Sequence, residues 1–483
     1  MKNLSMTKYI DKTKCVFEIE PLTRVKVKEN VTNNEKSALQ IIAILTGSFV
    51  AFTSGLLYAW PSPFLLKITQ DKVNYNISEN EASYFTITHA AGMLILPIFL
   101  VSISQIIGRK TILNLSTVPY IISFILKAFC TNIWLLYLAR FLAGAGDAIV
   151  FAALPVYIGE ISTPKIRGIW GNSFIIAVFL GQCGMNIIGS YCNVQLTSYI
   201  GLAIPVLFLI IFSFMPESPY YLIMRNRLED AKSSLRWLRC KEDVESEFTV
   251  MKVSVEKQSQ ECGSWKDLIS IKANRKALTA GVFLRISQLL TGVYVFAAYT
   301  QFIFAKAGGN ISPQMSAIIY TGVTVLMYSC AAYLSNKMGR RKAYMISIFL
   351  AGIVVLSEAT YFYLDTVHTE INLESWKWYP LVGMLLFVVV SSFGVGIIPT
   401  LMLGELFATS IKSKGISVLT CTFAGSIIIT NNIFYYLNSA TGLYGPFYLF
   451  GFCNIVFTFI AYYVVPETKG KTLDEIQQIL NDM

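Results

Sequence analysis

Long apolar runs separated by short polar segments make up most of this 483-residue chain. A helix that crosses the hydrocarbon core of a bilayer needs about 20 apolar residues, and the chain supplies a long series of such runs. Residues 168–216 and 415–466 contain no Asp, Glu, Lys or Arg, so each is predicted to hold two spans joined by an uncharged turn. The pattern therefore predicts an all-α membrane protein with 12 transmembrane helices. The expected spans lie near residues 38–62, 84–106, 111–132, 133–156, 168–190, 195–215, 277–304, 313–336, 343–364, 379–402, 414–437 and 444–465.

The composition agrees with this class, because 54% of the residues are hydrophobic and only 14% are charged, against about 25% charged in soluble proteins. The formal net charge of +10 raises the question of a nucleic-acid partner. With the N-terminus in the cytoplasm, 32 of the 39 Lys and Arg residues fall on the cytoplasmic side, which is the positive-inside bias of membrane proteins. The basic balance thus indicates topology, a multi-pass protein embedded in lipid with both termini cytoplasmic, and not a nucleic-acid partner. The expected location is the plasma membrane, and no obligate protein partner is expected.

The spans divide the chain into two sets of six around a polar interval. The first 37 residues are polar and basic and lack a short apolar core before a cleavage site, so no signal peptide is expected. In the interval, Leu228, Ala231, Leu235 and Leu238 share one helical face, which fits a packed linker helix or, alternatively, an amphipathic helix on the membrane surface. The expected parts are a cytoplasmic tail (1–37), a first six-helix half (38–216), a helical linker (217–276), a second six-helix half (277–465) and a C-terminal tail (466–483).

The two halves repeat the same charged signals in the same order. "GRK" (108–110) and "PESP" (216–219) in the first half correspond to "GRR" (339–341) and "PETKG" (466–470) in the second. Between them, Glu160 and Arg167 have the same separation as Glu405 and Lys412. A six-span unit used twice predicts two parallel halves related by an axis along the membrane normal, with a solute cavity between them. The alternative for any one charge is that it only marks the inner end of a helix.

Several longer motifs make the resemblance to a known family specific. They are "RFLAGAGDA" (140–148), "PVYIGEISTPKIRG" (155–168), "PESPYYL" (216–222), "GELF" (404–407) and "VPETKGKTLDEI" (465–476). In order and over both halves, the chain resembles the sugar porter family of the major facilitator superfamily, and more narrowly the insect facilitated trehalose or hexose transporters. The resemblance implies facilitative sugar or polyol transport by rocking of the two halves, with residues 217–276 as an intracellular helical bundle. It also implies charged clusters that close an inner gate, for which the candidates are Arg109, Arg140, Glu160, Arg167, Glu217, Arg340, Glu405, Lys412 and Glu467.

Sugar binding needs side chains that both donate and accept hydrogen bonds, beside an aromatic face. In the family this work falls largely to the seventh span, whose pattern is similar to Q-Q-x-S-G-I-N; here the stretch is "QLLTGVY" (288–294). Leu289 and Tyr294 depart from that pattern, and Ile175 and Thr400 stand where the family has a glutamine and a tryptophan. Asn431 and Asn432 are adjacent, so they cannot both face a cavity from one regular helix. The candidate solute-binding residues are Arg285, Gln288, Thr291, Tyr294, Thr324, Thr400, Asn431 and Asn432.

Ionisable residues inside the predicted spans are functional-site candidates by default. Arg285 lies three residues before Gln288, where the family usually has a neutral polar residue, and it either binds a carboxylate or phosphate on the solute or snorkels to water at the inner end of its span. Asp147 is expected to be bonded near Arg140 or the adjacent glycines and not free. Glu358 is expected to face water or another helix.

Other chemistries find little support in the sequence. Nine cysteines without a C-x-x-C pair and only two histidines argue against a metal site, no cofactor is implied, and no nucleophile–base pair suggests an enzyme. Proton-coupled relatives carry a first-span Asp, but here the nearest residue is Ser54, which favours a facilitator. A non-transporting nutrient sensor and a carrier of a different, anionic solute remain as alternatives. Sequons at Asn76 and Asn310 fall in loops expected outside, which predicts glycosylation there.

Overall fold

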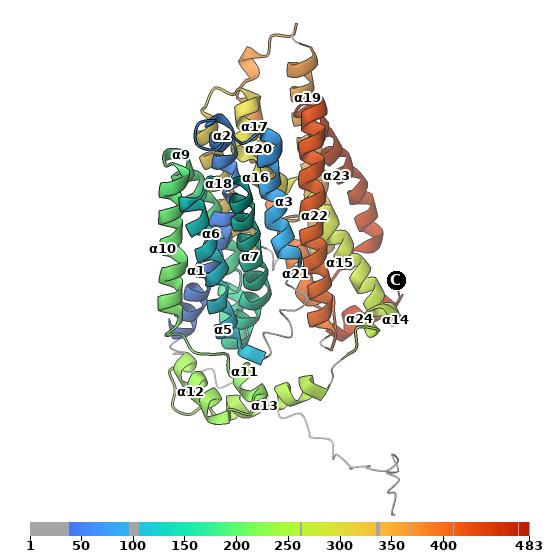
Figure 1. Ribbon diagram of the computed structural model, residues 1–483. Coiled ribbons are helices and arrows are strands. Elements are labelled where there is room, and N and C mark those ends of the chain that lie inside the picture. The colour runs from blue at the N-terminus through green and yellow to red at the C-terminus, as the bar shows by residue number, and fades with distance from the viewer. Residues whose placement is uncertain are drawn as a thin grey trace, which may run out of the picture. The chain divides into compact units, whose positions relative to one another are not determined.

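The structure is a computed structural model that describes residues 38–95, 106–260, 263–334, 339–368, 370–408, 410–471 and 473–482. Within these ranges the chain forms α-helices and one 3-10 turn, Glu374–Trp376, and no strand. Nine of the described helices are long and apolar enough to cross a bilayer. The predicted all-α membrane fold is therefore confirmed (Figure 1).

Nine described helices make up the first half. The expected span 38–62 continues to residue 70 with a break at Trp60, and the expected span 84–106 begins as a helix at residue 79 and runs into the stretch outside the described residues. The helices are α1 (Ala38–Ala59), α2 (Pro61–Gln70), α3 (Glu79–Ile95), α5 (Arg109–Leu115), α6 (Thr117–Phe129), α7 (Ile133–Ile161), α8 (Pro164–Trp170), α9 (Ser173–Tyr191) and α10 (Val194–Phe212).

The second half follows the linker and ends in a short terminal helix. Its helices are α15 (Lys272–Leu290), α16 (Val293–Ala298), α17 (Thr300–Ala307), α18 (Pro313–Leu334), α19 (Arg340–Val367), α20 (Tyr379–Ser392), α21 (Ile398–Glu405), α22 (Lys412–Thr441), α23 (Tyr444–Val464) and α24 (Leu473–Asp482). Contacts between the halves run along α3 with α22, α9 with α18 and α2 with α17. In Figure 1 the blue-to-green helices of the first half accordingly stand beside the yellow-to-red helices of the second.

Glycines set the closest helix crossings in the first half. A Cβ on Gly55 of α1 would lie 1.9 Å from the carbonyl oxygen of Val178 in α9. A Cβ on Gly144 of α7 would lie 1.8 Å from the carbonyl oxygen of His89 in α3. Small residues let membrane helices approach until their backbones touch. These crossings fix which side chains of α3 and α7 meet in the interior.

Two of the broken spans, the seventh (277–304) and the tenth (379–402), lie in the second half. The seventh span breaks after α15 at Gly292, whose φ of +92° is strained for any residue with a Cβ. It breaks again between α16 and α17. The tenth span breaks between α20 and α21, where a Cβ on Gly394 would lie 2.2 Å from the Cβ of Ser347. Breaks in spanning helices free backbone carbonyls for other partners, and these two lie next to the predicted solute site.

The linker folds into α11 (Pro219–Met224), α12 (Leu228–Arg239), α13 (Glu245–Gln260) and α14 (Asp267–Ser270). Ala231, Leu235 and Leu238 on α12 are fully buried in the protein, and α12 packs against α11 and α13. Leu228 is half-buried at the edge of the same cluster. The apolar face thus packs on protein, so the membrane-surface alternative is wrong for this helix.

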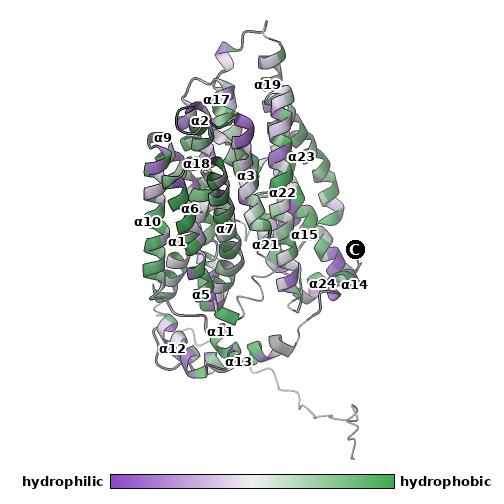
Figure 2. Ribbon diagram, in the orientation of Figure 1, coloured by the Kyte–Doolittle hydropathy of each residue, from purple (hydrophilic) through white to green (hydrophobic). Residues whose placement is uncertain are grey.

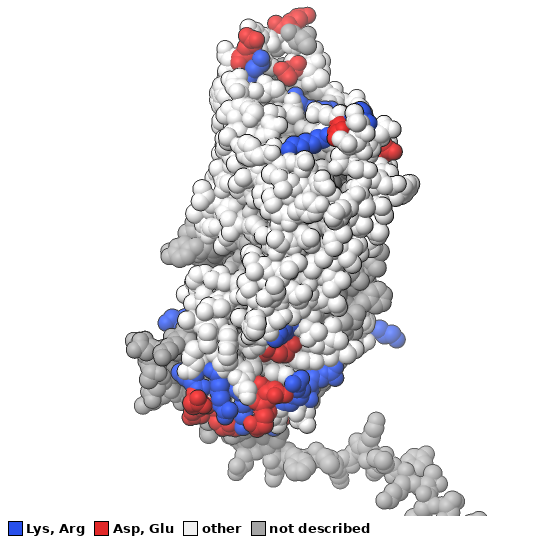
Figure 3. Space-filling view, turned by 60° about the vertical axis from the view of Figure 1, so that its left-hand side comes forward, with Lys and Arg blue, Asp and Glu red and all other residues white. Residues whose placement is uncertain are grey.

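The end of the helix bundle that carries α11, α12 and α13 is called the charged end below. On the face in Figure 3, Lys, Arg, Asp and Glu gather densely there and more sparsely at the opposite end, with a broad uncharged belt between. Figure 2 shows the same division by hydropathy, with mostly hydrophobic helices between more polar ends. This belt has the composition that a bilayer requires of its contact surface.

Candidate functional site

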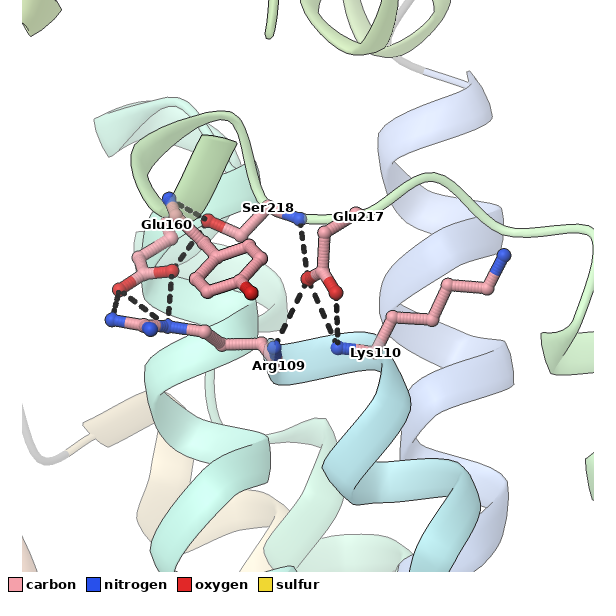
Figure 4. Close-up of polar contacts among 6 residues, drawn as sticks. Arg109, Lys110, Glu160, Glu217 and Ser218 are labelled. Carbon is pink, nitrogen blue, oxygen red and sulfur yellow. Dashed lines mark hydrogen bonds and ion pairs between the residues drawn. The ribbon is translucent and has the colours of Figure 1, made fainter. Parts of the chain in front are cut away.

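The first charged cluster lies at the charged end and joins α5, α7 and the start of α11 (Figure 4). The guanidinium of Arg109 donates from Nε and a terminal nitrogen to the carboxylate of Glu160, with N–O distances of 3.1 to 3.3 Å. The hydroxyl of Ser218 donates to the other side of that carboxylate. Only 8% of the Arg109 side chain and 16% of the Glu160 side chain is exposed, so this pair is screened less by water than a surface pair.

Glu217 belongs to the same cluster and binds backbone N–H groups at the start of α5. Its carboxylate accepts hydrogen bonds from the backbone N–H groups of Arg109 at 3.1 Å and Lys110 at 3.0 Å. These are unpaired donors at the start of α5, which an acidic side chain stabilises. Gly108 precedes them with a φ of +101°, and a Cβ there would lie 2.4 Å from Glu217 Oε2. The "GRK" and "PESP" motifs therefore fold as one unit.

The second cluster repeats this arrangement in the second half. Arg340 donates to Glu405 Oε1 at 3.2 Å, and Thr468 donates to Glu405 Oε2 at 2.5 Å. Glu467 accepts from the backbone N–H groups of Arg340 at 2.9 Å and Arg341 at 3.2 Å. Arg340, Glu405, Glu467 and Thr468 thus take the places of Arg109, Glu160, Glu217 and Ser218. The sequence repeat is a structural repeat down to individual hydrogen bonds.

Three predicted gate residues lie outside these two clusters. Arg167 of α8 donates to the carbonyl of Ser162, the residue that follows α7, at 3.2 Å. In the described part of the chain, neither Arg167 nor Lys412 has an ion pair. Arg140 lies in the middle of α7, where it donates to the carbonyls of Phe85, at 2.9 Å, and Leu57. Arg140 therefore does not join the charges at the charged end, because its position along α7 puts it among apolar helices.

The predicted solute residues of the second half meet where the two broken spans touch. Gln288 donates from Nε2 to the carbonyls of Val395 and Gly396 at 3.1 Å each, in the break between α20 and α21. Arg285 donates to Gln288 Oε1 at 2.8 Å and to Thr400 Oγ1 at 3.4 Å. These three side chains form one network, which we call the central network.

An aromatic wall adjoins the central network. The ring of Phe423 lies 4.9 Å from the guanidinium carbon of Arg285, and the ring of Tyr294 packs edge-on against Phe423 at 5.0 Å. Tyr58 of α1 donates to the carbonyl of Tyr294 at 3.2 Å, so the first half contacts this wall. Thr291 donates to the carbonyl of Gln288 at 2.6 Å and stabilises the end of α15.

The remaining predicted solute residues lie apart from the central network. Thr324 lines a cavity of about 20 Å³ together with Gln182, Tyr328 and Ser391, which has room for one water molecule and is too small for a sugar. Asn432 donates to the carbonyl of Ile428 at 2.9 Å on its own helix. Asn431 is 2% exposed and its Oδ1 has no hydrogen-bond partner in the described chain. The two asparagines point differently, as their adjacency predicts.

Two polar clusters were not predicted from the sequence. The first contains Asp147, which accepts from Tyr120 at 2.6 Å and lies 2.9 Å from Nε2 of His89. Asp147 is therefore bonded and not free, as expected, and its hydrogen-bond partners are Tyr120 and His89 and not the adjacent glycines. All three of these side chains are buried, and they join α3, α6 and α7 across the first half.

The second unpredicted cluster joins the two halves at the end opposite the charged end. Gln301 of α17 donates to Ser190 at 3.0 Å and to Asn186 at 3.4 Å, both on α9. Ser62 of α2 donates to Asn186 at 2.8 Å. Polar residues in these runs were visible in the sequence, but nothing in one chain's pattern shows which of them pair. This cluster closes the opposite end between the halves.

Of the two alternatives expected for Glu358, water or another helix, the structure shows the second. Its side chain is 1% exposed, and both carboxylate oxygens lack a hydrogen-bond partner among the described residues. A Cβ on Gly383 of α20 would meet Glu358 Oε1 at 1.6 Å. Glu358 therefore faces a neighbouring helix and not water.

Comparison with known proteins identifies the family. The family model described as "Sugar (and other) transporter" matches residues 39–480. The facilitated trehalose transporter Tret1 of Polypedilum vanderplanki is 30% identical over 94% of this chain and 90% of its own length. The facilitated trehalose transporter Tret1-2 homolog of Drosophila simulans is 31% identical over 91% of this chain and 90% of its own.

Solved structures show the same fold. The major facilitator superfamily proton:xylose symporter XylE bound to 6-bromo-6-deoxy-D-glucose superposes with a TM-score of 0.73, at 19% identity over 92% of this chain and all of that chain. The inward open conformation of XylE from E. coli gives a TM-score of 0.74 at 18% identity, over 91% of this chain and 99% of that chain. Because the family model covers nearly the whole chain, from the first described helix to the last, the chain belongs to the sugar transporter family and has the major facilitator fold.

Proposed function

We propose that the chain is a facilitative transporter that moves a sugar such as trehalose or glucose, or a related polyol, across the membrane by rocking of its two halves. The relatives that match it over almost its full length are named facilitated trehalose transporters. No cofactor and no catalytic residue enters this function. The solute is the only small-molecule partner it requires.

The observation that carries the proposal is the meeting of the two broken spans at Gln288. A sugar site needs neutral donors and acceptors that are held in place but are not all used up. Gln288 bonds free carbonyls of the tenth span, and Thr400 lies one turn into α21. Rearrangement of either broken helix changes these bonds, so solute binding and helix movement are coupled at this point. The proposed solute site is the central network with Tyr294 and Thr291, and Thr324, Asn431 and Asn432 join it when the halves part.

The proposed gate uses the two charged clusters as rigid ends of the halves. Each ion pair, Arg109 with Glu160 and Arg340 with Glu405, lies within one half. Alternating access then needs only the contacts between halves to change, while each cluster moves as a unit. Arg167 and Lys412 have no ion pair in the described chain, and we assign them to contacts that form when the charged end closes.

The proposed mode of transport follows from the lack of an acidic residue in the first span. Ser54 is buried in α1 at the position nearest the acid of proton-coupled relatives. A serine does not take up or release a proton over the physiological range. We therefore propose uniport down the solute gradient, without proton coupling.

The proposed orientation puts the charged end in the cytoplasm and the protein in the plasma membrane, following the positive-inside bias. Asn76 and Asn310 are exposed in loops at the opposite end, where a glycosyltransferase of the secretory pathway has access. Treatment with an N-glycosidase is expected to increase the mobility of the expressed protein. The double variant Asn76→Gln, Asn310→Gln is expected to show no such change, and a persisting change would place the glycan elsewhere.

The function is tested by uptake of labelled trehalose, glucose and a polyol into oocytes that express the chain, at two external pH values. Saturable, pH-independent uptake is expected. Gln288→Leu should reduce it at least tenfold, because the side chain loses three hydrogen bonds of about 0.5–1.5 kcal/mol each and about 1.4 kcal/mol corresponds to a factor of ten. The matched control is Gln195→Leu, the same change at an exposed position on α10. Absence of uptake at normal surface expression would contradict transport and favour the sensor alternative.

A further inference from the structure

Arg285 is a buried cation that no acid compensates within the described chain. Its side chain is 7% exposed, its hydrogen bonds go to the neutral groups of Gln288 and Thr400, and its Nε has no hydrogen-bond partner among the described residues. Among the other buried arginines, Arg109 and Arg239 each form an ion pair with a glutamate. Arg140 bonds backbone carbonyls, but it has the negative charge of Asp147 as an electrostatic partner. The alternative that Arg285 snorkels to water at the end of its span is wrong, because the guanidinium lies against Phe423 inside the protein.

A guanidinium cannot remove this imbalance by losing its proton, because it stays charged at any physiological pH. Burial of an unpaired charge is costly, and two neutral hydrogen bonds and one aromatic contact offset only part of that cost. The free energy of the site therefore falls when an anion binds to the guanidinium. Since no acid of the described residues pairs with Arg285, an anion that enters the protein would supply its ion pair.

The groups around Arg285 indicate which other chemical groups such an anion carries. Gln288 and Thr400 touch the guanidinium, and Tyr294 packs on the same Phe423 ring. Amide and hydroxyl groups are suited to the hydroxyls of a polyol, and an aromatic face is suited to its C–H surface. Tyr58 of the other half reaches the backbone of Tyr294, so a solute bound here lies between the halves.

We propose that the transported solute includes a hydroxylated monocarboxylate, a sugar acid whose carboxylate binds Arg285. This inference rests on the proposed transport function and names the chemical class of its solute. A planar carboxylate accepts two parallel hydrogen bonds from Nε and a terminal nitrogen of one arginine. One guanidinium neutralises one carboxylate, whereas a doubly charged phosphate would keep an uncompensated negative charge in the membrane interior.

The test compares labelled D-glucuronate with labelled glucose and trehalose in oocytes. Wild-type protein is expected to take up glucuronate saturably, with an outward current because net negative charge enters. Arg285→Gln is expected to reduce glucuronate uptake at least tenfold more than it reduces neutral-sugar uptake. Arg285→Lys keeps the charge but cannot donate two parallel hydrogen bonds, so its glucuronate uptake should fall between those of wild type and Arg285→Gln. The matched control Arg275→Gln removes an exposed arginine of the same helix and should leave both uptakes unchanged.

The outcomes separate this inference from the proposed function. Normal neutral-sugar uptake without glucuronate uptake, or an equal loss of both in Arg285→Gln, would overturn the anionic solute and leave the sugar transporter standing. Uptake of neither class at normal surface expression would contradict transport itself. If Arg285→Gln fails to reach the surface, competition in wild type decides: excess glucuronate should inhibit glucose uptake. Inhibition by glucose 6-phosphate or inorganic phosphate but not by glucuronate would replace the carboxylate with a phosphate and refute the proposal.

Discussion

Replacement of Glu160 by glutamine probes the charged cluster of the first half most directly. Glu160 accepts three hydrogen-bond contacts from Arg109 and one from Ser218. Glutamine keeps the size and one acceptor oxygen of the side chain but removes the charge. The guanidinium of Arg109, 8% exposed, then loses its carboxylate partner while it stays desolvated.

Loss of one member of a buried ion pair costs about 3–5 kcal/mol. Because Glu160 is 16% exposed, solvent screening reduces the expected loss to roughly 2–3 kcal/mol. Unfolding of a protein this large is generally irreversible, so stability is measured as a rate. If half of the loss lowers the unfolding barrier, the protein inactivates about tenfold faster, since about 1.4 kcal/mol changes a rate tenfold. The equivalent Glu405→Gln should have a smaller effect, because Glu405 is 29% exposed.

The assay heats detergent-solubilised protein at one temperature and follows the remaining folded fraction by size-exclusion chromatography. Glu160→Gln should decay about tenfold faster than wild type, and the exposed control Glu229→Gln should match wild type. The double variant Arg109→Gln, Glu160→Gln should decay more slowly than Glu160→Gln, because no uncompensated charge remains. Equal decay of Glu160→Gln and Glu229→Gln, or additive effects in the double variant, would refute the buried ion pair.

Three further perturbations follow from the helix breaks and the interior clusters. Gly292→Ala places a Cβ on a residue with a φ of +92° and within 2.7 Å of the Phe296 ring. The resulting strain of about 1–3 kcal/mol should lower uptake per surface molecule about tenfold. The control Gly159→Ala, whose added Cβ meets nothing within 4 Å, should match wild type. Gln301→Leu removes two hydrogen bonds between α17 and α9. A cysteine introduced at Thr300 should then be labelled faster by a thiol reagent added at the opposite end. Unchanged labelling would contradict a closed opposite end. Asp147→Asn removes the negative charge nearest to buried cations, and should cost about 3 kcal/mol, seen as reduced surface biotinylation, whereas normal surface levels would refute its structural role.

The charged clusters could be predicted from the sequence because their members lie in neighbouring loops and recur at equal spacing. The same spacing did not show where the side chain of Arg167 lies. Pro164 starts a new helix after Ser162, and the Arg167 side chain turns back to the Ser162 carbonyl. A repeat in the sequence guarantees equivalent positions in both halves, but it does not guarantee that each position touches its neighbours in the repeat.

The helix breaks and the His89–Asp147 contact could not be predicted from the sequence, for different reasons. Hydropathy is continuous across "QLLTGVYVF", and glycine is common in spanning helices, so Gly292 alone did not reveal the break. The contact between His89 and Asp147 depends on the register of α3 against α7, which the Gly144 crossing sets. That register is a property of packing between segments more than 50 residues apart, and no local pattern encodes it.

The two halves share a fold and a gate motif but distribute their interior charge differently. In the first half, the buried cations Arg140 and Lys127 lie in the same helix bundle as Asp147. In the second half, neither Arg285 nor Glu358 has a partner of opposite charge among the described residues. These two are not equivalent, because a carboxyl group can take up a proton and become neutral, while a guanidinium cannot become neutral. The positive charge that lacks a partner among the described residues is therefore that of Arg285, which lies where the two broken spans meet. This asymmetry supports the proposal that the second half selects the chemistry of the solute.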